Sequence, residues 1–306
     1  MLRLLSIPLA LLLCLGAYGK DKKKPPEEVD PDPGKGVNFY SMEREIALGR
    51  QMAREVEMEA RMVYDQSISE YVNRLGQNLV RNSDAKVPFT IKVVDSDEVN
   101  AFALPGGYLF VNTGLILKSE SEAELAGVMA HEIAHVAARH GTRQATRGQL
   151  INYGTIPLIF VGGWAGYAVR QIAAVAVPMG FLKFSRGMET EADKLGLQYV
   201  YKSGYDPTAF VDFFERIQAV EHARPGTIAR VFSSHPMTNE RIRHAQKEIQ
   251  TDFAPLPDYV VDTSEFHEVR DKLARIQARR MGQEQNEYLP TLKRRTFEKR
   301  EPRTSQ

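Results

Sequence analysis

The feature that most constrains this chain is a pair of histidines, His131 and His135, one helical turn apart, with Glu132 directly after the first. Residues at i and i+4 lie on the same face of an α-helix, so both imidazoles can bind one metal ion. A carboxylate beside the first ligand can act as a general base. The alternative is a surface helix, but the apolar neighbours, among them Met129 and Ile133, oppose exposure. Since buried imidazoles and carboxylates are costly without partners, the pattern predicts a metal site.

A metal held by two histidines needs a third protein ligand. The metzincin pattern would have a histidine at position 141, where this chain has Gly141, and His140 is one residue out of register. The other common solution is a carboxylate from a following helix. Glu189 and Asp193 are four residues apart and share a helical face, whereas Glu191 points nearly the opposite way. A pair on one face can supply a ligand and its orienting partner, so the spacing favours Glu189 over Glu191.

Apolar periodicity and capping residues predict a mostly helical chain with one small sheet. Helices are expected along the apolar positions 68, 72, 75 and 79, and after the capping residues Ser41, Ser121, Ser185, Asp206 and Thr238. Residues 89–93 alternate apolar with polar, and two extended segments flank the turn at 105–107, which predicts strands. Gly141 is expected to end the helix that begins after Ser121. The fold class is therefore α+β.

Four motifs are spaced along the middle of the chain. They are residues 100–114 (Asn-Ala-Phe-Ala-Leu-Pro-Gly-Gly-Tyr-Leu-Phe-Val-Asn-Thr-Gly), residues 131–135, Ser185-Arg186 with residues 189–193, and Ser234-His235-Pro236 with Arg241. Over about residues 41–250 the chain resembles the zinc endopeptidases that include the CAAX prenyl protease and the bacterial HtpX-type proteases. It is most similar to the exported periplasmic branch that maintains outer-membrane assembly. No helical repeat array follows residue 250, which departs from that branch.

This resemblance implies a mostly helical, gluzincin-like metallopeptidase domain over residues 41–255, with one Zn²⁺ per subunit. Glu189 would be the third zinc ligand beside His131 and His135, which agrees with the spacing argument. The Asp193 position has a proton-donor or supporting role in the family. Glu132 would act as the general base in hydrolysis of a peptide bond. The expected partners are protein or peptide substrates, namely misfolded or stalled envelope proteins.

The segment Asn100, Ala101, Phe102 and Ala103 is a candidate substrate-binding strand. An edge strand can pair with an extended peptide through main-chain hydrogen bonds. The alternative is an ordinary buried strand, and the sequence leaves the two open.

His235 lies in a loop directly before a predicted helix. It could cap or pack, stabilise a developing oxyanion, or occupy the open position of zinc as a latch. In the exported branch a His-Pro loop can approach the zinc, so the resemblance favours the latch.

The amino terminus predicts export. Arg3, the apolar run 4–15 and small residues before the first charges are the parts of a signal peptide, expected over residues 1–19. The localisation would then be the periplasm or cell envelope. An uncleaved amphipathic anchor and a lipoprotein attached through Cys14 are the weaker alternatives. Residues 20–40, rich in charge and proline, predict a disordered linker.

Two later segments bear on membranes and partners. Residues 151–169 carry no charge and are long enough to span a bilayer, but several glycines interrupt them, so we expect a non-spanning hydrophobic hairpin with peripheral membrane contact through 151–184. Residues 256–306 predict a helix and a basic, solvated tail. The formal net charge of +1 provides no field to recruit nucleic acid.

Three functions compete at this point. The first is an exported zinc endopeptidase. Glu132 favours it, because a structural zinc site has no use for a carboxylate at this position. The second is a chaperone-like binding protein whose zinc site is latched and largely inactive. The third is an integral membrane protease of the HtpX type. A structural zinc site is closed by protein ligands, whereas a catalytic one keeps a position open.

Overall fold

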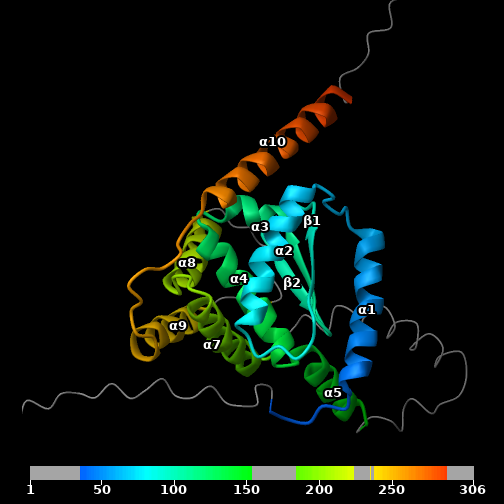
Figure 1. Ribbon diagram of the computed structural model, residues 1–306. Coiled ribbons are helices and arrows are strands. Elements are labelled where there is room, and N and C mark those ends of the chain that lie inside the picture. Colours follow the sequence, from blue (N-terminus) through cyan, green and yellow to red (C-terminus); the bar gives the residue numbers. More distant parts are fainter. Residues whose placement is uncertain (1–34, 154–183, 224–234, 236–237, 288–306) are drawn as a thin grey trace, which may run out of the picture.

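The computed structural model describes residues 35–153, 184–223, 235 and 238–287 (Figure 1). The predicted signal peptide, Cys14, most of the predicted linker and nearly all of the predicted hydrophobic hairpin 151–184 lie outside the described residues. Within the described part, no helix is long and apolar enough to cross a membrane.

The elements follow one another as a mostly helical chain with a three-stranded sheet. In order they are α1 (Met42–Glu59), α2 (Gln66–Arg81), β1 (Thr90–Val94), β2 (Ala101–Leu104), β3 (Tyr108–Asn112), α3 (Thr113–Lys118), α4 (Glu122–Ala137), α5 (His140–Tyr153), α7 (Arg186–Lys202), α8 (Thr208–Ala223), α9 (Asn239–Asp252) and α10 (Ser264–Glu287). The α+β prediction is confirmed. The predicted caps Ser41, Ser121, Ser185 and Thr238 each accept a hydrogen bond from a backbone N–H of the first helical turn.

Helix α4 lies at the centre of the molecule, with α2 on one side and α7 and α8 on the other (Figure 1). Every residue from Glu122 to Val136 is buried, so the helix has no solvent-facing side. A helix that is buried on all sides forms part of the core of the protein. Helix α7 crosses α4 closely because Gly196 has no side chain: a Cβ there would lie 3.1 Å from the Cα and N of His131.

The sheet has the strand order β1-β3-β2, with β1 parallel and β2 antiparallel to β3. Strand β2 is therefore an edge strand. Gly106 and Gly107 form the turn between β2 and β3 with φ of 77° and 94°, a region that favours glycine. The predicted strands and turn are confirmed.

The end of α4 differs from the prediction. The helix ends at Ala137 and not near Gly141, which is the second residue of α5. Arg139 breaks the helix with a left-handed φ of 54°. Its guanidinium stabilises this turn, since it binds Glu45 Oε2 at 2.7 Å and donates to the Tyr40 carbonyl oxygen at 2.6 Å. The partners belong to the N-terminal part of the chain, so local sequence around residue 139 could not reveal the break.

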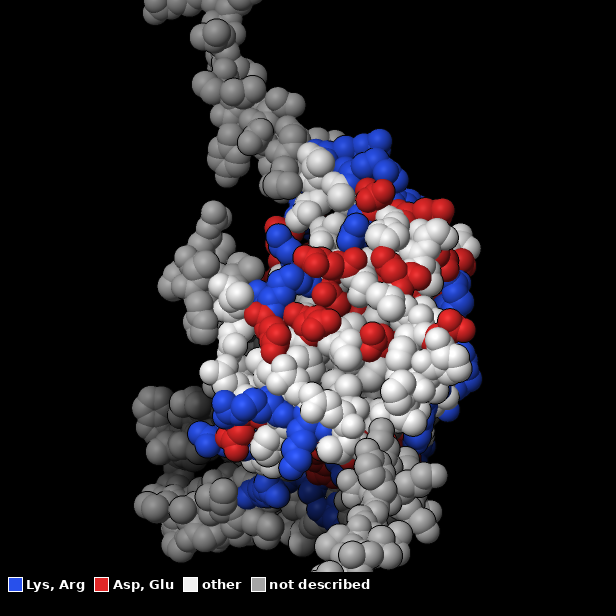
Figure 2. Space-filling model, turned by 90° about the vertical axis from the view of Figure 1, so that its left-hand side faces the viewer, with Lys and Arg blue, Asp and Glu red and all other residues white. Residues whose placement is uncertain are grey.

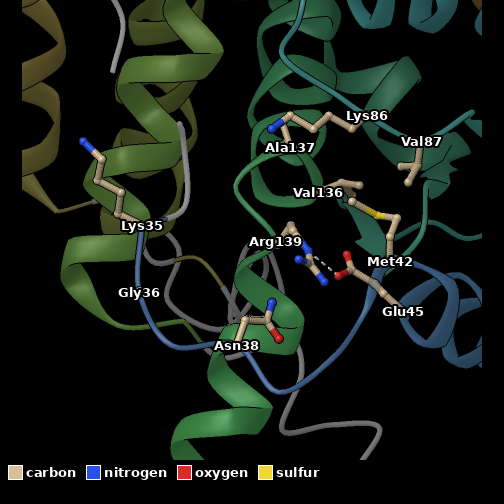
Figure 3. Close-up of a pocket in the computed structure, with 10 residues that line it drawn as sticks. All are labelled: Lys35, Gly36, Asn38, Met42, Glu45, Lys86, Val87, Val136, Ala137 and Arg139. Carbon is tan, nitrogen blue, oxygen red and sulfur yellow. Dashed lines mark hydrogen bonds and ion pairs between the residues drawn. The ribbon is translucent and has the colours of Figure 1, made fainter. Parts of the chain in front are cut away.

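Residues 35–40, which we call the N-terminal strap, lie against the start of α5. Asn38 Nδ2 donates to Thr142 Oγ1 at 2.9 Å, and the Phe39 N–H donates to Thr146 Oγ1 at 3.0 Å. Figure 3 shows the strap passing beside the Arg139–Glu45 ion pair, at a cavity of about 270 Å³. The last residues of the predicted linker are thus packed on α5.

Helix α10 buries Phe266, Val269 and Leu273 at its start and then projects beyond the body (Figure 1). Further along, Arg280 binds Asp95 at 2.6 Å and Asp97 at 3.0 Å. Figure 2 shows one face of the molecule, with Lys and Arg gathered at its upper and lower ends and Asp and Glu spread over its middle. Charges of both signs share this face, in keeping with the near-zero net charge.

We predict that Gly107→Ala destabilises the fold by at least about 2 kcal/mol, because the left-handed backbone is strained for alanine and the new Cβ would lie 2.2 Å from the Pro88 carbonyl oxygen. Urea unfolding followed by circular dichroism measures the change. The matched control is Gly148→Ala in α5, where a Cβ meets nothing within 4 Å. It should leave the free energy of unfolding unchanged or raise it by up to about 1 kcal/mol. Equal effects of the two substitutions would contradict the prediction.

Candidate metal centre

Four buried side chains from separate parts of the chain converge beside α4. His131 and His135 come from α4, Glu189 from the first turn of α7, and His235 from the segment before α9. Their ligand atoms all lie within 4.8 Å of one another. The Nε2 atoms of His131 and His135 are 3.1 Å apart, and each lies within 3.8 Å of a Glu189 carboxylate oxygen. His235 Nδ1 lies 2.8 Å from Glu189 Oε1.

This geometry fits a metal ion. Two nitrogen ligands at the usual zinc distance, in tetrahedral arrangement, are separated by about 3.3 Å, close to the spacing of the two Nε2 atoms. At that distance one ring nitrogen can donate a hydrogen bond to the other, or the lone pairs of both can bind one cation. Among the described residues, His235 Nε2 and Glu132 Oε1 are buried without a hydrogen-bond partner.

The charges around the site also favour a divalent cation. Glu132, Glu189 and Asp193 are three buried carboxylates at the site, and the buried guanidinium of Arg241 pairs with Glu189 and Asp193. Burial alone would lower the pKa of His131, but Asp193 and Glu189 outweigh it and raise this pKa to about 9. The site thus draws positive charge, and a bound dication would neutralise the excess.

Asp193 is buried and contacts the candidate ligand His131. Its Oδ1 lies 3.1 Å from His131 Nδ1. Arg241 donates hydrogen bonds to both carboxylate oxygens, from Nε to Oδ2 at 2.7 Å and from Nη2 to Oδ1 at 2.6 Å. Burial favours the neutral acid, but the hydrogen bonds from Arg241 and His131 outweigh burial and hold the pKa of Asp193 below its usual value. A carboxylate kept ionised in this way suits the orientation of His131 and not the donation of a proton.

Glu132 stands beside the four-residue group and is joined to the sheet. Its Oε2 accepts a hydrogen bond from the Ala103 N–H of β2 at 3.2 Å, while its Oε1 faces His235 Nε2 at 3.8 Å. Burial raises the pKa of Glu132, which increases its basicity. The structure thus brings the candidate base and the candidate substrate strand together. Of that strand, Ala101 and Ala103 are buried and Phe102 is half-buried, while Asn100 immediately precedes it.

Sequence reasoning missed two side chains that touch the ligands. His140 Nδ1 lies 2.8 Å from His135 Nδ1, and its Nε2 lies 3.1 Å from Glu191 Oε2. The Phe184 ring stacks on His135, with ring centroids 4.2 Å apart. His140 could be found only by anticipating the turn at Arg139, and no local signal marks Phe184.

Comparison with known proteins agrees with this arrangement. The family model for peptidase family M48 matches residues 66–249, which include α4, the sheet and α7. The chain belongs to peptidase family M48. The metallopeptidase resemblance and the predicted enzyme class, a metalloendopeptidase, are therefore confirmed.

Named relatives of this M48 peptidase come from bacteria and from mitochondria. It is 31% identical over 233 residues to a beta-barrel assembly-enhancing protease of Yersinia pestis, covering 72% of this chain and 47% of the relative. The protein of that name from Escherichia coli K12 is 32% identical over 227 residues, covering 71% and 46%. The mitochondrial metalloendopeptidase OMA1 of Schizosaccharomyces pombe is 31% identical over 179 residues, covering 58% and 52%. The chain thus spans about half the length of these relatives.

We predict that Glu189→Ala abolishes stoichiometric metal binding, because it removes the carboxylate that lies within 3.8 Å of the Nε2 atoms of both His131 and His135. The matched control is Glu191→Gln, two residues along the same helix, which keeps an acceptor for His140 and should retain about one metal per chain. Elemental analysis of dialysed protein measures both contents. Loss of metal in the Glu191 variant with retention in the Glu189 variant would show the opposite ligand choice.

Proposed function

We propose that this M48 peptidase is an exported zinc endopeptidase that cleaves misfolded or stalled proteins of the cell envelope. The observation that carries the proposal is the position of Glu132, which is buried beside the four-residue ligand group and whose Oε1 has no hydrogen-bond partner among the described residues. A site with only a structural metal has no need of such a carboxylate. The names of the bacterial relatives, which refer to beta-barrel assembly, support an envelope substrate.

Zinc is the metal proposed, because imidazole nitrogens and one carboxylate in a compact group of four are its usual donor set. His131, His135 and Glu189 would hold it, one ion per subunit. When bound, zinc would supply Lewis acidity that polarises the scissile carbonyl. Asp193, fixed by Arg241, would keep the ring of His131 in place.

Glu132 is proposed to move the proton. Burial raises the pKa of Glu132 toward neutral pH. A general base works best when its pKa lies near the pH at which the enzyme operates. The Ala103 N–H fixes Oε2, which leaves Oε1 to take a proton from the attacking water and then deliver it to the leaving amine. With its low pKa and its two hydrogen bonds from Arg241, Asp193 is proposed to support the site and not to donate this proton.

The substrate is proposed to bind as an extended strand along β2, at Asn100, Ala101, Phe102 and Ala103. Strand β2 is an edge strand of the sheet, and its Ala103 N–H points away from β3 toward Glu132. An added peptide strand would place its backbone next to the candidate base. Because main-chain hydrogen bonds would give most of the affinity, this mode suits substrates with exposed unfolded segments.

A second candidate function, a latched binding protein, rests on His235. Its ring lies among the ligands, so it could complete the metal coordination and close the site. We propose that His235 is a removable latch on an enzyme: coordination by its imidazole would exclude water until the segment moves. The enzyme remains the favoured function because a permanently closed site would leave Glu132 without a role.

Localisation and partners extend this proposal. The predicted signal peptide would place the protein in the periplasm or cell envelope, and peripheral membrane contact is proposed through 151–184. Protein or peptide substrates are the expected partners, and nucleic acid is not.

We predict that Glu132→Gln keeps one zinc per chain but lowers casein degradation by at least about 10²-fold, because it removes the base and no ligand. Zinc content and proteolysis are measured on the same preparation, with a chelator-treated wild-type sample as the reference for metal dependence. Wild-type activity in the variant, or activity that survives complete metal removal, would disprove the mechanism.

We predict that His235→Ala raises basal casein degradation with zinc retained, because the latch is removed while three ligands remain. An oxyanion-stabilising role predicts the reverse, a fall in kcat of about 10²–10³-fold. Unchanged activity would leave His235 with a packing role only. Relaxation measurements on the Co²⁺-substituted protein report the exchange of water at the metal. In His235→Ala this exchange should increase only if His235 is a latch.

A further inference from the structure

His140 is a fully buried histidine whose two ring nitrogens both have partners. Its Nδ1 lies 2.8 Å from Nδ1 of the candidate ligand His135, and its Nε2 lies 3.1 Å from Glu191 Oε2. Glu191 also accepts a hydrogen bond from Arg143 Nη1 at 3.2 Å. The four residues form a continuous chain that leads from α5 and α7 to the metal centre. We call it the His140 relay.

The direction of each hydrogen bond in the relay follows from the ends. If His135 uses Nε2 for a metal, its proton lies on Nδ1, so Nδ1 donates to His140 Nδ1. His140 then carries its own proton on Nε2 and donates it to the Glu191 carboxylate. Each of the four ring nitrogens then has one role, as metal ligand, hydrogen-bond donor or hydrogen-bond acceptor, and both histidines are neutral.

The backbone is arranged to bring these two histidines together. On a continuous helix, residues five apart point about 140° away from each other. Here α4 ends at Ala137, Arg139 adopts a left-handed φ of 54°, and α5 begins at His140 itself. The turn reverses the direction of the ring so that it meets His135. A left-handed arginine is uncommon and is maintained by surrounding contacts, here with Glu45 and Tyr40.

The far end of the relay is held by the N-terminal strap. Arg143 donates through Nη2 to the Lys35 carbonyl oxygen and through Nη1 to Glu191. Thr142, the neighbour of Arg143, accepts from Asn38 in the same strap. The guanidinium is therefore fixed on two sides, and it fixes Glu191 in turn.

We propose that His140, held by Glu191 and Arg143, is a positioning residue that orients His135 for metal binding. The inference rests on the proposed function, and it assigns to the two histidine ligands different supports: a direct carboxylate, Asp193, for His131, and a histidine–carboxylate relay for His135. Outer partners of metal-bound histidines typically contribute about 10–100-fold to metal affinity.

The test compares His140→Phe with His140→Asn in the full chain. Phenylalanine fills the space without an acceptor, whereas the asparagine oxygen lies about where Nδ1 does and can accept from His135. Zinc affinity, measured by competition with a chromophoric chelator, should fall about 10–100-fold in the Phe variant and by less than about fivefold in the Asn variant. The control is His244→Phe, at an exposed histidine in α9, which should match wild type.

The visible spectrum of the Co²⁺-loaded protein is a second readout. It should change in His140→Phe and be restored in His140→Asn, because ligand orientation alters the cobalt environment. Wild-type affinity and spectrum in a folded Phe variant would overturn the inference. Equal loss of zinc affinity in the Phe and Asn variants would also overturn the inference. The shape of the side chain, and not its ability to accept a hydrogen bond from His135, would then determine the affinity.

A second pair of variants tests the relay if the first pair does not fold. If His140→Phe does not fold, Glu191→Leu and Glu191→Gln replace the pair, and only the leucine, which cannot accept from His140, should weaken zinc binding. Equal zinc affinity in these two variants would overturn the inference. Failure of the proposed function is seen separately, as a wild-type chain that binds no zinc or shows no chelator-sensitive proteolysis.

Discussion

Helix α4 buries His131, Glu132 and His135 inside an apolar core, and the cost of taking these groups out of water accounts for much of what surrounds them. Each group needs a partner, and each partner comes from a different element. Strand β2 supplies an amide to Glu132, and α7 supplies Glu189 and Asp193. The fold can therefore be understood as a set of elements packed around one polar cluster on a central helix.

Close packing is what makes these contacts possible. Because Gly196 lets α7 approach the backbone of α4 at His131, the carboxylates of Glu189 and Asp193 reach the imidazoles directly. Arg241 from α9 then binds both carboxylates, which ties a third helix to the site. Stability and chemistry share these interactions, since the same hydrogen bonds that compensate burial also orient the candidate ligands.

The candidate site lies between three packed elements on one side and His235 on the other. Strand β2, α4 and α7 are joined through backbone and buried side-chain contacts. His235 approaches from the other side and contacts Glu189 and the two α4 histidines. If His235 acts as the proposed latch, this one side chain would control access to the metal while the other ligands stay preorganised.

The sequence alone determined the α+β class, the strands around the 105–107 turn, most helix starts and the identity of the motif helix. These follow from periodicity, capping and spacing, all of which are local. The same spacing put Glu189 and Asp193 on one helical face, and the structure places both beside His131. Their roles as ligand and support are proposals built on that placement.

Only the tertiary structure decided where α4 ends and what stands behind His135. The break at Arg139 depends on Glu45, which is 94 residues earlier in the chain, so no local pattern contains it. His140 does not fit the histidine spacing of the metzincins, but because of that break it lies next to His135. Glu191 likewise points away from the ligands along α7, as its spacing predicts, yet meets His140 because α5 folds back toward it. Such contacts join segments distant in sequence, and packing, not periodicity, selects them.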